Sequence, residues 1–167
     1  AIPGMIKGIE MVHLEKCTLP MSEIIKPAVT YAREGVYLSK MQAGFIKLLE
    51  PIFTSTQSSM DVYGTPDGKL IDETHLYKNP AYADFLEEFA VEGAKLFYEG
   101  HVADEIEKIT KDCDGLILKE DLKNYKCIKR MPIDFMYKDY EIVTNPPPSG
   151  GGILIAFALK ILEKYDL

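Results

Sequence analysis

The stretch that decides the fold is Tyr140–Leu162, YEIVTNPPPSGGGILIAFALKIL. Its first residues alternate between polar and apolar, which predicts a β-strand. Residues 146–152 are prolines, a serine and glycines, and an apolar segment with helical spacing follows. Proline fixes φ, and glycine adopts backbone angles that other residues avoid. The stretch therefore predicts a rigid strand-to-helix corner, with Ser149 as the N-cap of the helix.

A second interpretation of this corner is a ligand-contacting loop, because free N–H groups at a helix start can hold an anion. A phosphate-binding P-loop needs Lys and then Ser or Thr after its glycines, whereas Ile153 follows Gly152 here. The dinucleotide fingerprint G-x-G-x-x-G is missing as well. A rigid corner is the favoured interpretation.

The residues before the corner predict a β-hairpin. The segment CIKRMPIDFMY (127–137) has no helical stripe, and YKDY (137–140) joins it to the alternating run. Pro132 cannot donate a ladder hydrogen bond, so it places the first strand at an edge or a bulge.

The remainder of the chain is expected to be helical. Pro3 suits a first helical turn, and Ser22 is expected to cap a helix that Gly35 ends. Pro27 should start a new helix or cause a kink near Lys26. A further helix is expected at 39–49, before Pro51, and 54–80 is expected to be a long loop with TPDG (65–68) as a turn.

Four more helical segments are expected between residues 79 and 125. Asn79 and Pro80 have the features of an N-cap and first residue, and Gly93 ends that helix. Its buried face is expected to contain Tyr82, Phe85, Leu86 and Phe89. AKLFYEG (94–100), His101 to Lys111 and LKEDLKNY (118–125) are the others. The predicted fold class is α+β, predominantly helical, with a C-terminal β-hairpin.

The composition of the chain limits the classes of function that it can have. The 167 residues suit one domain, and the net charge of -7 argues against nucleic acid or an anionic membrane as the main partner. No apolar run reaches the roughly 20 residues of a membrane span, and we find no signal peptide. Cys17, Cys113 and Cys127 form no metal spacing, and their odd number argues against a complete disulfide framework. The compartment stays open.

No residue of the chain fits a catalytic, cofactor-binding or metal-binding role. His13, His75 and His101 share no metal-binding frame, although His101 lies near Asp104 and Glu105. Those acidic residues suit the first turn of a helix. Glu87 and Glu88 are adjacent and point in different directions, so they indicate a solvated face. G-x-S-x-G is absent.

Position 1 is also unsuited to catalysis. An N-terminal nucleophile would have to be Thr, Ser or Cys, whereas the first residue is Ala1. Both ends of the sequence are expected to be cut from a longer polypeptide, the last residues lying at the end of an amphipathic helix.

Five motifs in order carry a family resemblance. They are AIPGMIKGIEMVH (1–13), TLPMSEIIKPAVTYAREG (18–35), LFYEGHVADEI (96–106), GLILKEDLKNYKCIKRMPI (115–133) and YEIVTNPPPSGGGILIAFALKILEKYDL (140–167). Together they resemble the γ-glutamyltranspeptidase family, most weakly between Phe53 and Asn79. The family usually reads P-P-P-S-S-G-G, whereas Gly150 replaces the second serine here.

The resemblance implies an N-terminal-nucleophile hydrolase with a four-layer αββα fold. The whole segment 1–167 would be an interior part of the large subunit, helical over 1–125 with a hairpin and helix over 126–167. The precursor would cleave itself. An N-terminal Thr of the small subunit would then attack γ-glutamyl amides such as glutathione, and an acyl-enzyme would pass the glutamyl group to water or an amino acid.

The resemblance also implies where the reacting groups lie. The Arg that holds the glutamyl carboxylate would precede Ala1, and the Thr and the oxyanion glycines would follow Leu167. Gly151 and Gly152 are not those glycines. The segment alone is predicted to be inactive and to need no cofactor. Its partners would be the small subunit of the same precursor and, through the parent, the γ-glutamyl substrate and acceptor.

Two alternatives remain open. One is a related acylase that removes the side chain of a β-lactam precursor on the same scaffold. The other is a non-catalytic helical interaction domain. An independent domain should lack a large exposed apolar patch, whereas a section of a larger fold should expose one near the hairpin and last helix, or cover it by self-association.

Overall fold

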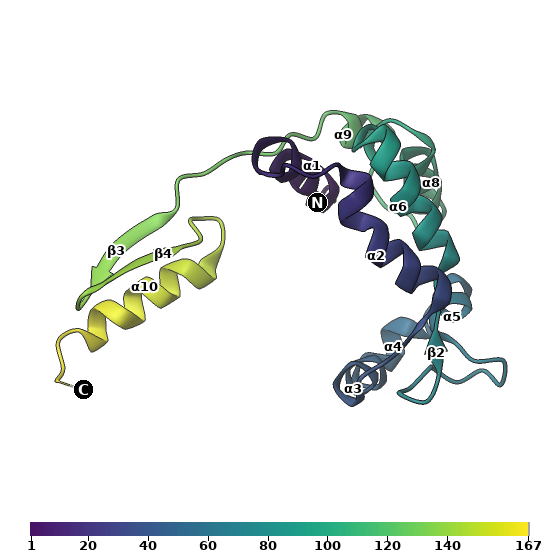
Figure 1. Cartoon of the computed structure of the whole chain (residues 1–167), viewed down its shortest axis with the longest axis horizontal. Coiled ribbons are helices and arrows are strands. Elements are labelled where there is room, and N and C mark those ends of the chain that lie inside the picture. Colours follow the sequence, from purple (N-terminus) through teal and green to yellow (C-terminus); the bar gives the residue numbers. More distant parts are fainter. Residues whose placement is uncertain (167) are drawn as a thin grey trace. The chain divides into compact units, whose positions relative to one another are not determined.

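A computed structural model describes residues 1–166 of the chain. The chain divides into two compact units, Ala1–Lys126 and Cys127–Leu167, and Leu167 lies outside the described residues. The first unit is helical apart from a two-stranded sheet, and the second is a β-hairpin with one long helix (Figure 1). The predicted α+β class, predominantly helical with a C-terminal hairpin, is confirmed.

The first unit begins with helices α1 (Met5–Lys16) and α2 (Met21–Glu34). Sequence reasoning was wrong at the start of α2: Pro20 is the N-cap, its carbonyl accepts from Glu23 and Ile24, and Ser22 lies inside the helix. The helix also runs through Pro27 without a new start. Proline removes only the hydrogen bond to the Glu23 carbonyl, and both residues are exposed, so water can satisfy that group.

Residues 36–77 contain more structure than the sequence predicted. Strands β1 (Val36–Tyr37) and β2 (Leu76–Tyr77) pair antiparallel, and α3 (Lys40–Leu48), α4 (Glu50–Phe53) and α5 (Gln57–Tyr63) lie between them. Ser39 caps α3 in a capping box with Gln42, as the predicted start at residue 39 requires. Pro51 does not end the helical region, because it occupies the first turn of α4.

The expectation of a long loop at 54–80 is wrong, because α5 and β2 lie within it. Thr56 begins α5, since its hydroxyl accepts from the Ser59 amide at 3.2 Å. The ring of Tyr63 packs on Phe53 and Tyr77, with ring centroids 4.7 and 5.7 Å apart. Aromatic contacts between residues far apart in sequence thus stabilise a helix that local periodicity does not reveal. The predicted turn at TPDG is present, with Gly68 at φ +79°.

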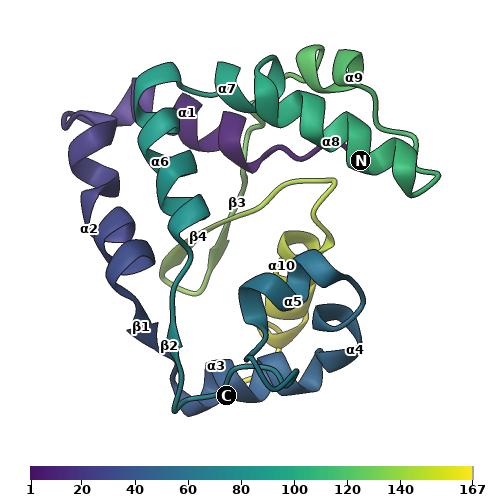
Figure 2. The same ribbon diagram turned by 90° about the vertical axis from the view of Figure 1, so that its right-hand side faces the viewer.

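Helix α6 (Pro80–Glu92) lies beside α2 (Figure 2). The Asn79 side chain accepts from the Tyr82 amide at 3.0 Å, and Gly93 ends the helix at φ +66°, as predicted. Leu86 and Phe89 are buried, but Tyr82 is not: it is 51% exposed, and Ala83 is fully buried instead. A small side chain allows the close approach that a tyrosine would block.

The core of the first unit lies where α6 meets α7 (Lys95–Tyr98), α8 (His101–Asp112) and α9 (Lys119–Lys123). Its buried residues are Phe89, Ala94, Leu96, Tyr98, Ala103 and Leu122. Hydrogen bonds tie residues 3–10 to this core. Tyr98 donates its hydroxyl to the Pro3 carbonyl at 2.7 Å and accepts from the Lys7 amide at 3.2 Å, and Glu10 accepts from the Ala94 amide at 2.7 Å.

In the second unit, β3 (Ile133–Tyr137) pairs antiparallel with β4 (Tyr140–Thr144), and α10 (Gly150–Leu162) packs against β3. The predicted hairpin is confirmed, and Pro132 directly precedes its first strand. Lys160 ties the helix to the hairpin by donating to the Met136 carbonyl at 2.6 Å. The helix ends at Leu162, before the end of the described chain. No helix of residues 1–166 combines the length and apolarity needed to cross a lipid bilayer.

Candidate functional site

The corner between β4 and α10 is a close backbone contact. A Cβ at Gly152 would collide with the backbone of Asn145, whose carbonyl oxygen is the nearest atom. Only glycine fits this position, so the corner aims α10 by letting two backbone segments approach. Ser149 occupies the N-cap position, but its side chain makes no capping hydrogen bond, contrary to its predicted role. The geometry fits the rigid-corner interpretation.

The histidines and carboxylates noted in the sequence do not converge. His101 lies 3.6 Å from Glu88, and Asp104 binds Lys119 at 2.6 Å. Among residues 1–166, no group of three or more His, Cys, Asp and Glu side chains could hold a metal ion. Free thiols are found at all three cysteines.

Adjacent Glu87 and Glu88 face different helices, as helical geometry predicts. The Glu87 and Asp84 carboxylates accept from the Arg33 guanidinium at 2.6 and 2.7 Å and link α6 to α2. These hydrogen bonds, Glu87 first, raise the pKa of Arg33 above its ordinary value. Glu88 instead lies toward His101 on α8. Both carboxylates serve surface contacts between helices.

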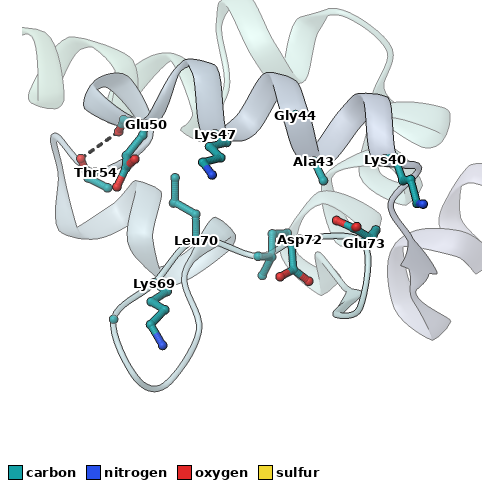
Figure 3. A pocket seen from close by; sticks show the side chains of 12 residues that line it. Lys40, Ala43, Gly44, Lys47, Glu50, Thr54, Lys69, Leu70, Asp72 and Glu73 are labelled. Carbon is teal, nitrogen blue, oxygen red and sulfur yellow. Dashed lines mark hydrogen bonds between the residues drawn. The ribbon is translucent and has the colours of Figure 1, made fainter.

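A groove of about 550 Å³ lies between α3, the start of α4 and the 68–73 segment (Figure 3). We call it the α3 groove. Its lining residues are Lys40, Ala43, Gly44, Lys47, Glu50, Thr54, Gly68, Lys69, Leu70, Ile71, Asp72 and Glu73. Buried Ala43 and Ile71 help form its floor, and all the lining residues belong to the first unit.

The two walls of the α3 groove differ in the balance of their charges. Lys40 and Lys47 on α3 share their wall with Glu50 at the start of α4, and Figure 3 shows Asp72 and Glu73 on the opposite segment, which also carries Lys69. Lys69 is occupied elsewhere, because it pairs with Asp67 at 2.7 Å. Neither the Lys40 nor the Lys47 ammonium group lies within 4.0 Å of a carboxylate of residues 1–166.

Asp72 is held as an anion by its neighbours. Its Oδ1 accepts from the Thr74 hydroxyl at 2.7 Å and the Thr74 amide at 2.8 Å, and it lies 2.8 Å from His75 Nδ1. These bonds, that of the Thr74 hydroxyl first, lower the pKa of Asp72 to about 2. The carboxylate is therefore charged at any physiological pH.

The α3 groove is suited to binding and lacks the parts of a nucleophilic centre. The one hydroxyl in its lining, that of Thr54, donates to the Glu50 carbonyl at 2.8 Å within its own helix. A nucleophile of this kind needs a base within hydrogen-bond reach. Sequence reasoning missed the groove; the two lysines seven residues apart on one helix were the available signal.

The whole chain, residues 1–167, matches the sequence profile described as Gamma-glutamyltranspeptidase. The chain belongs to the gamma-glutamyltranspeptidase family. It is 31% identical over 166 residues to the glutathione hydrolase proenzyme of Escherichia coli and 34% identical over 166 residues to the capsule biosynthesis protein CapD proenzyme of Bacillus anthracis. Those alignments cover 99% of this chain but only 28% and 30% of the two proteins.

Solved structures of similar proteins have the same fold. The γ-glutamyltranspeptidase of Helicobacter pylori superimposes with a TM-score of 0.94 at 33% identity, over 100% of this chain and 48% of that one. The cephalosporin acylase of Bacillus halodurans gives 0.90 at 25% identity, over 100% of this chain and 32% of that one. The chain spans less than a third of the length of the Escherichia coli and Bacillus anthracis proenzymes. The family resemblance seen in its motifs is confirmed.

Proposed function

We propose that the chain is a section of the large subunit of a γ-glutamyltransferase or hydrolase that cleaves γ-glutamyl amides such as glutathione. The match of the whole chain to the family, together with the 31% identity to a glutathione hydrolase proenzyme, carries the proposal. The "proenzyme" in the relatives' names supports a precursor that is cut into two subunits.

In the proposed reaction, the nucleophile is an N-terminal Thr of the small subunit, outside this chain. Its hydroxyl oxygen bonds to the γ-carbonyl carbon, and its proton passes through the α-amine of the same Thr to the leaving nitrogen. The C–N bond breaks and leaves a glutamyl ester. Water or an amino acid then attacks that ester and frees the Thr.

The role of the present chain in this proposal is structural. In the proposed four-layer αββα fold, the β3–β4 hairpin belongs to one sheet and α10 covers it, as α10 does in the second unit. Residues 1–125 are the proposed helical part and 126–167 the hairpin and helix. The exposed Asp134, Met136 and Val143 are available to meet the rest of the protein.

The precursor encoded by the complete gene tests the proposal. Expressed whole, it should cut itself into two chains and release a chromogenic amine from a γ-glutamyl anilide. The 167-residue segment alone should release none. A precursor that stays uncut and leaves the anilide intact would refute the catalytic proposal, and turnover by the segment alone would refute the purely structural role.

A related acylase is the second candidate, favoured by the TM-score of 0.90 with the cephalosporin acylase. The same precursor can decide between the two. Faster hydrolysis of a glutaryl or adipyl side chain on a β-lactam than of a γ-glutamyl anilide would select the acylase. We favour the γ-glutamyl reaction because the identity is 33% to the transpeptidase structure and 25% to the acylase.

A further inference from the structure

The α3 groove holds opposite charges apart. Lys40 and Lys47 are seven residues apart on α3, about two turns or 10 Å along the axis, so they lie on one face of the helix. Asp72 and Glu73 lie on the facing segment (Figure 3). No ion pair closes between these walls within residues 1–166, and the 550 Å³ between them is large enough for a small molecule.

Charged side chains of both walls are unpaired within the described chain, whereas the Asp72 carboxylate is directed away from α3 and is bonded to Thr74 and His75 (Figure 3). Within the described chain, the side chains of Lys40, Lys47 and Glu73 form no ion pair or hydrogen bond with one another or with other residues. Asp72 keeps its negative charge because the Thr74 bonds stabilise the carboxylate. A purely anionic ligand would be repelled by the acidic wall, and a purely cationic ligand by the lysines.

The floor between the charged walls is small and apolar. It contains Ala43, Leu70 and Ile71, and a Cβ at Gly44 would meet no atom within 4 Å. Gly44 therefore leaves open space along the middle of the groove. An aliphatic backbone of two or three residues could occupy it while the two ends reach opposite walls.

We propose that the α3 groove binds a small dipolar ligand, an amino acid or short peptide with both a free carboxylate and a free ammonium group. The carboxylate lies on the Lys40 and Lys47 side, and the ammonium group on the Asp72 and Glu73 side. Binding needs no catalytic turnover, so this site goes beyond the proposed function.

The test uses the full-length processed protein and three forms of one dipeptide: dialanine, N-acetyl-dialanine and dialanine amide. Calorimetry measures affinity, and hydrogen–deuterium exchange locates binding on residues 40–54 and 68–75. We expect dialanine to protect these segments, and each capped form to bind about two- to fivefold more weakly, because each loses one contact with a solvent-exposed charge. Equal binding of all three forms, or no protection of these segments, overturns the proposal.

Matched variants assign the effect to the groove. Lys47→Met and Glu73→Gln should each weaken the binding of dialanine about two- to fivefold, because both side chains are exposed. Gly44→Leu should abolish binding by filling the space. Gly44→Ala controls for the loss of glycine, and Lys108→Met for the loss of an exposed lysine outside the groove; both should retain binding. Unchanged affinity in Gly44→Leu overturns the proposal.

Hydrolysis of a γ-glutamyl anilide by the unmodified protein is measured separately. Failure of the groove to bind dialanine is therefore distinguishable from failure of the proposed γ-glutamyl reaction.

Discussion

At the scale of single residues, a few positions are fixed by backbone approach or by a single polar contact. Gly152 is set by the Asn145 backbone, and Gly93 by its positive φ beside the Glu10 carboxylate. The pKa of Asp72 is lowered chiefly by hydrogen bonds from the hydroxyl and amide of Thr74. Each of these gives a direct prediction.

Gly152→Ala should destabilise the protein by about 1–3 kcal/mol, because its new methyl group must displace the rigid Asn145 backbone. Gly151→Ala is the matched control: its Cβ would meet only Ser149 Oγ at 4.0 Å, and alanine favours helix by about 0.5–1 kcal/mol. Urea unfolding of both variants measures the difference. Equal stability of the two would show that the corner does not depend on this contact.

Glu10→Ala should cost about 1–3 kcal/mol of unfolding free energy, because the partly buried Ala94 amide loses its acceptor. Glu10→Gln keeps a neutral acceptor and should recover part of that loss. Thermal unfolding distinguishes the two variants. If alanine and glutamine behave alike, the hydrogen bond is not what stabilises the α1–α7 contact.

The Asp72 carboxyl should titrate near pH 2 when followed by NMR. The pKa in the folded protein is below the ordinary value of about 3.9, so the contribution of the Thr74 contacts to folding stability is fully present above about pH 4. That contribution declines below this pH and is lost as the pH falls through about 2. Thr74→Ala should move the titration upward toward the ordinary value, whereas Thr74→Ser, which keeps the hydroxyl, should leave it low.

At the scale of elements, apolar packing of α6 stabilises the first unit more than its surface ion pairs do. Phe89 is 4% exposed and lies in the core, whereas Arg33 and its two carboxylates are in contact with water. Exposed ion pairs contribute little because solvent screens them.

Phe89→Ala should therefore lower the unfolding free energy by about 3–5 kcal/mol, through lost burial and a cavity. Tyr82→Ala, on the same helix but half exposed, should cost below about 1 kcal/mol. Chemical denaturation of the two variants gives the comparison. Similar costs would mean that the helix is stabilised by its whole surface and not by its buried face.

At the scale of the whole molecule, the apolar face of α10 is exposed within the chain. Leu154 is 67% and Phe157 66% exposed. The exposed large apolar residues of this helix are Ile153, Leu154, Ile155, Phe157, Ile161 and Leu162. A patch of this kind marks a surface that another segment or chain covers. It favours a section of a larger fold over an independent interaction domain.

Expressed alone, the 167-residue segment should bind a hydrophobic dye and self-associate, as measured by fluorescence and light scattering. Leu154→Glu with Phe157→Glu should reduce both signals, because charges replace the two most exposed apolar side chains of the helix. A double substitution at exposed lysines of α8, Lys108→Glu and Lys111→Glu, is the control and should change neither. A monomeric segment without dye binding would contradict the expectation.

The sequence alone determined the elements whose signals are local. Asn79 with Pro80, the helix expected from residue 39, and the alternation over residues 140–145 each depend on a signal that lies within a few positions. The order of motifs likewise determined the family, because it needs no knowledge of packing. The sequence also predicts that this chain contributes no catalytic, cofactor-binding or metal-binding residue, and that statement stays a prediction.

Only the tertiary structure decided the features that depend on distant contacts. Helix α5 forms where the ring of Tyr63 packs edge-on against Phe53 and stacks on Tyr77, and the sequence of 54–80 has no periodicity that indicates this helix. Ala83 is buried in place of Tyr82 because a neighbouring helix approaches closely. The α3 groove exists because β1–β2 pairing returns the 68–73 segment to α3. Burial and facing charges are properties of chain segments brought together in space, and spacing along the sequence does not encode them.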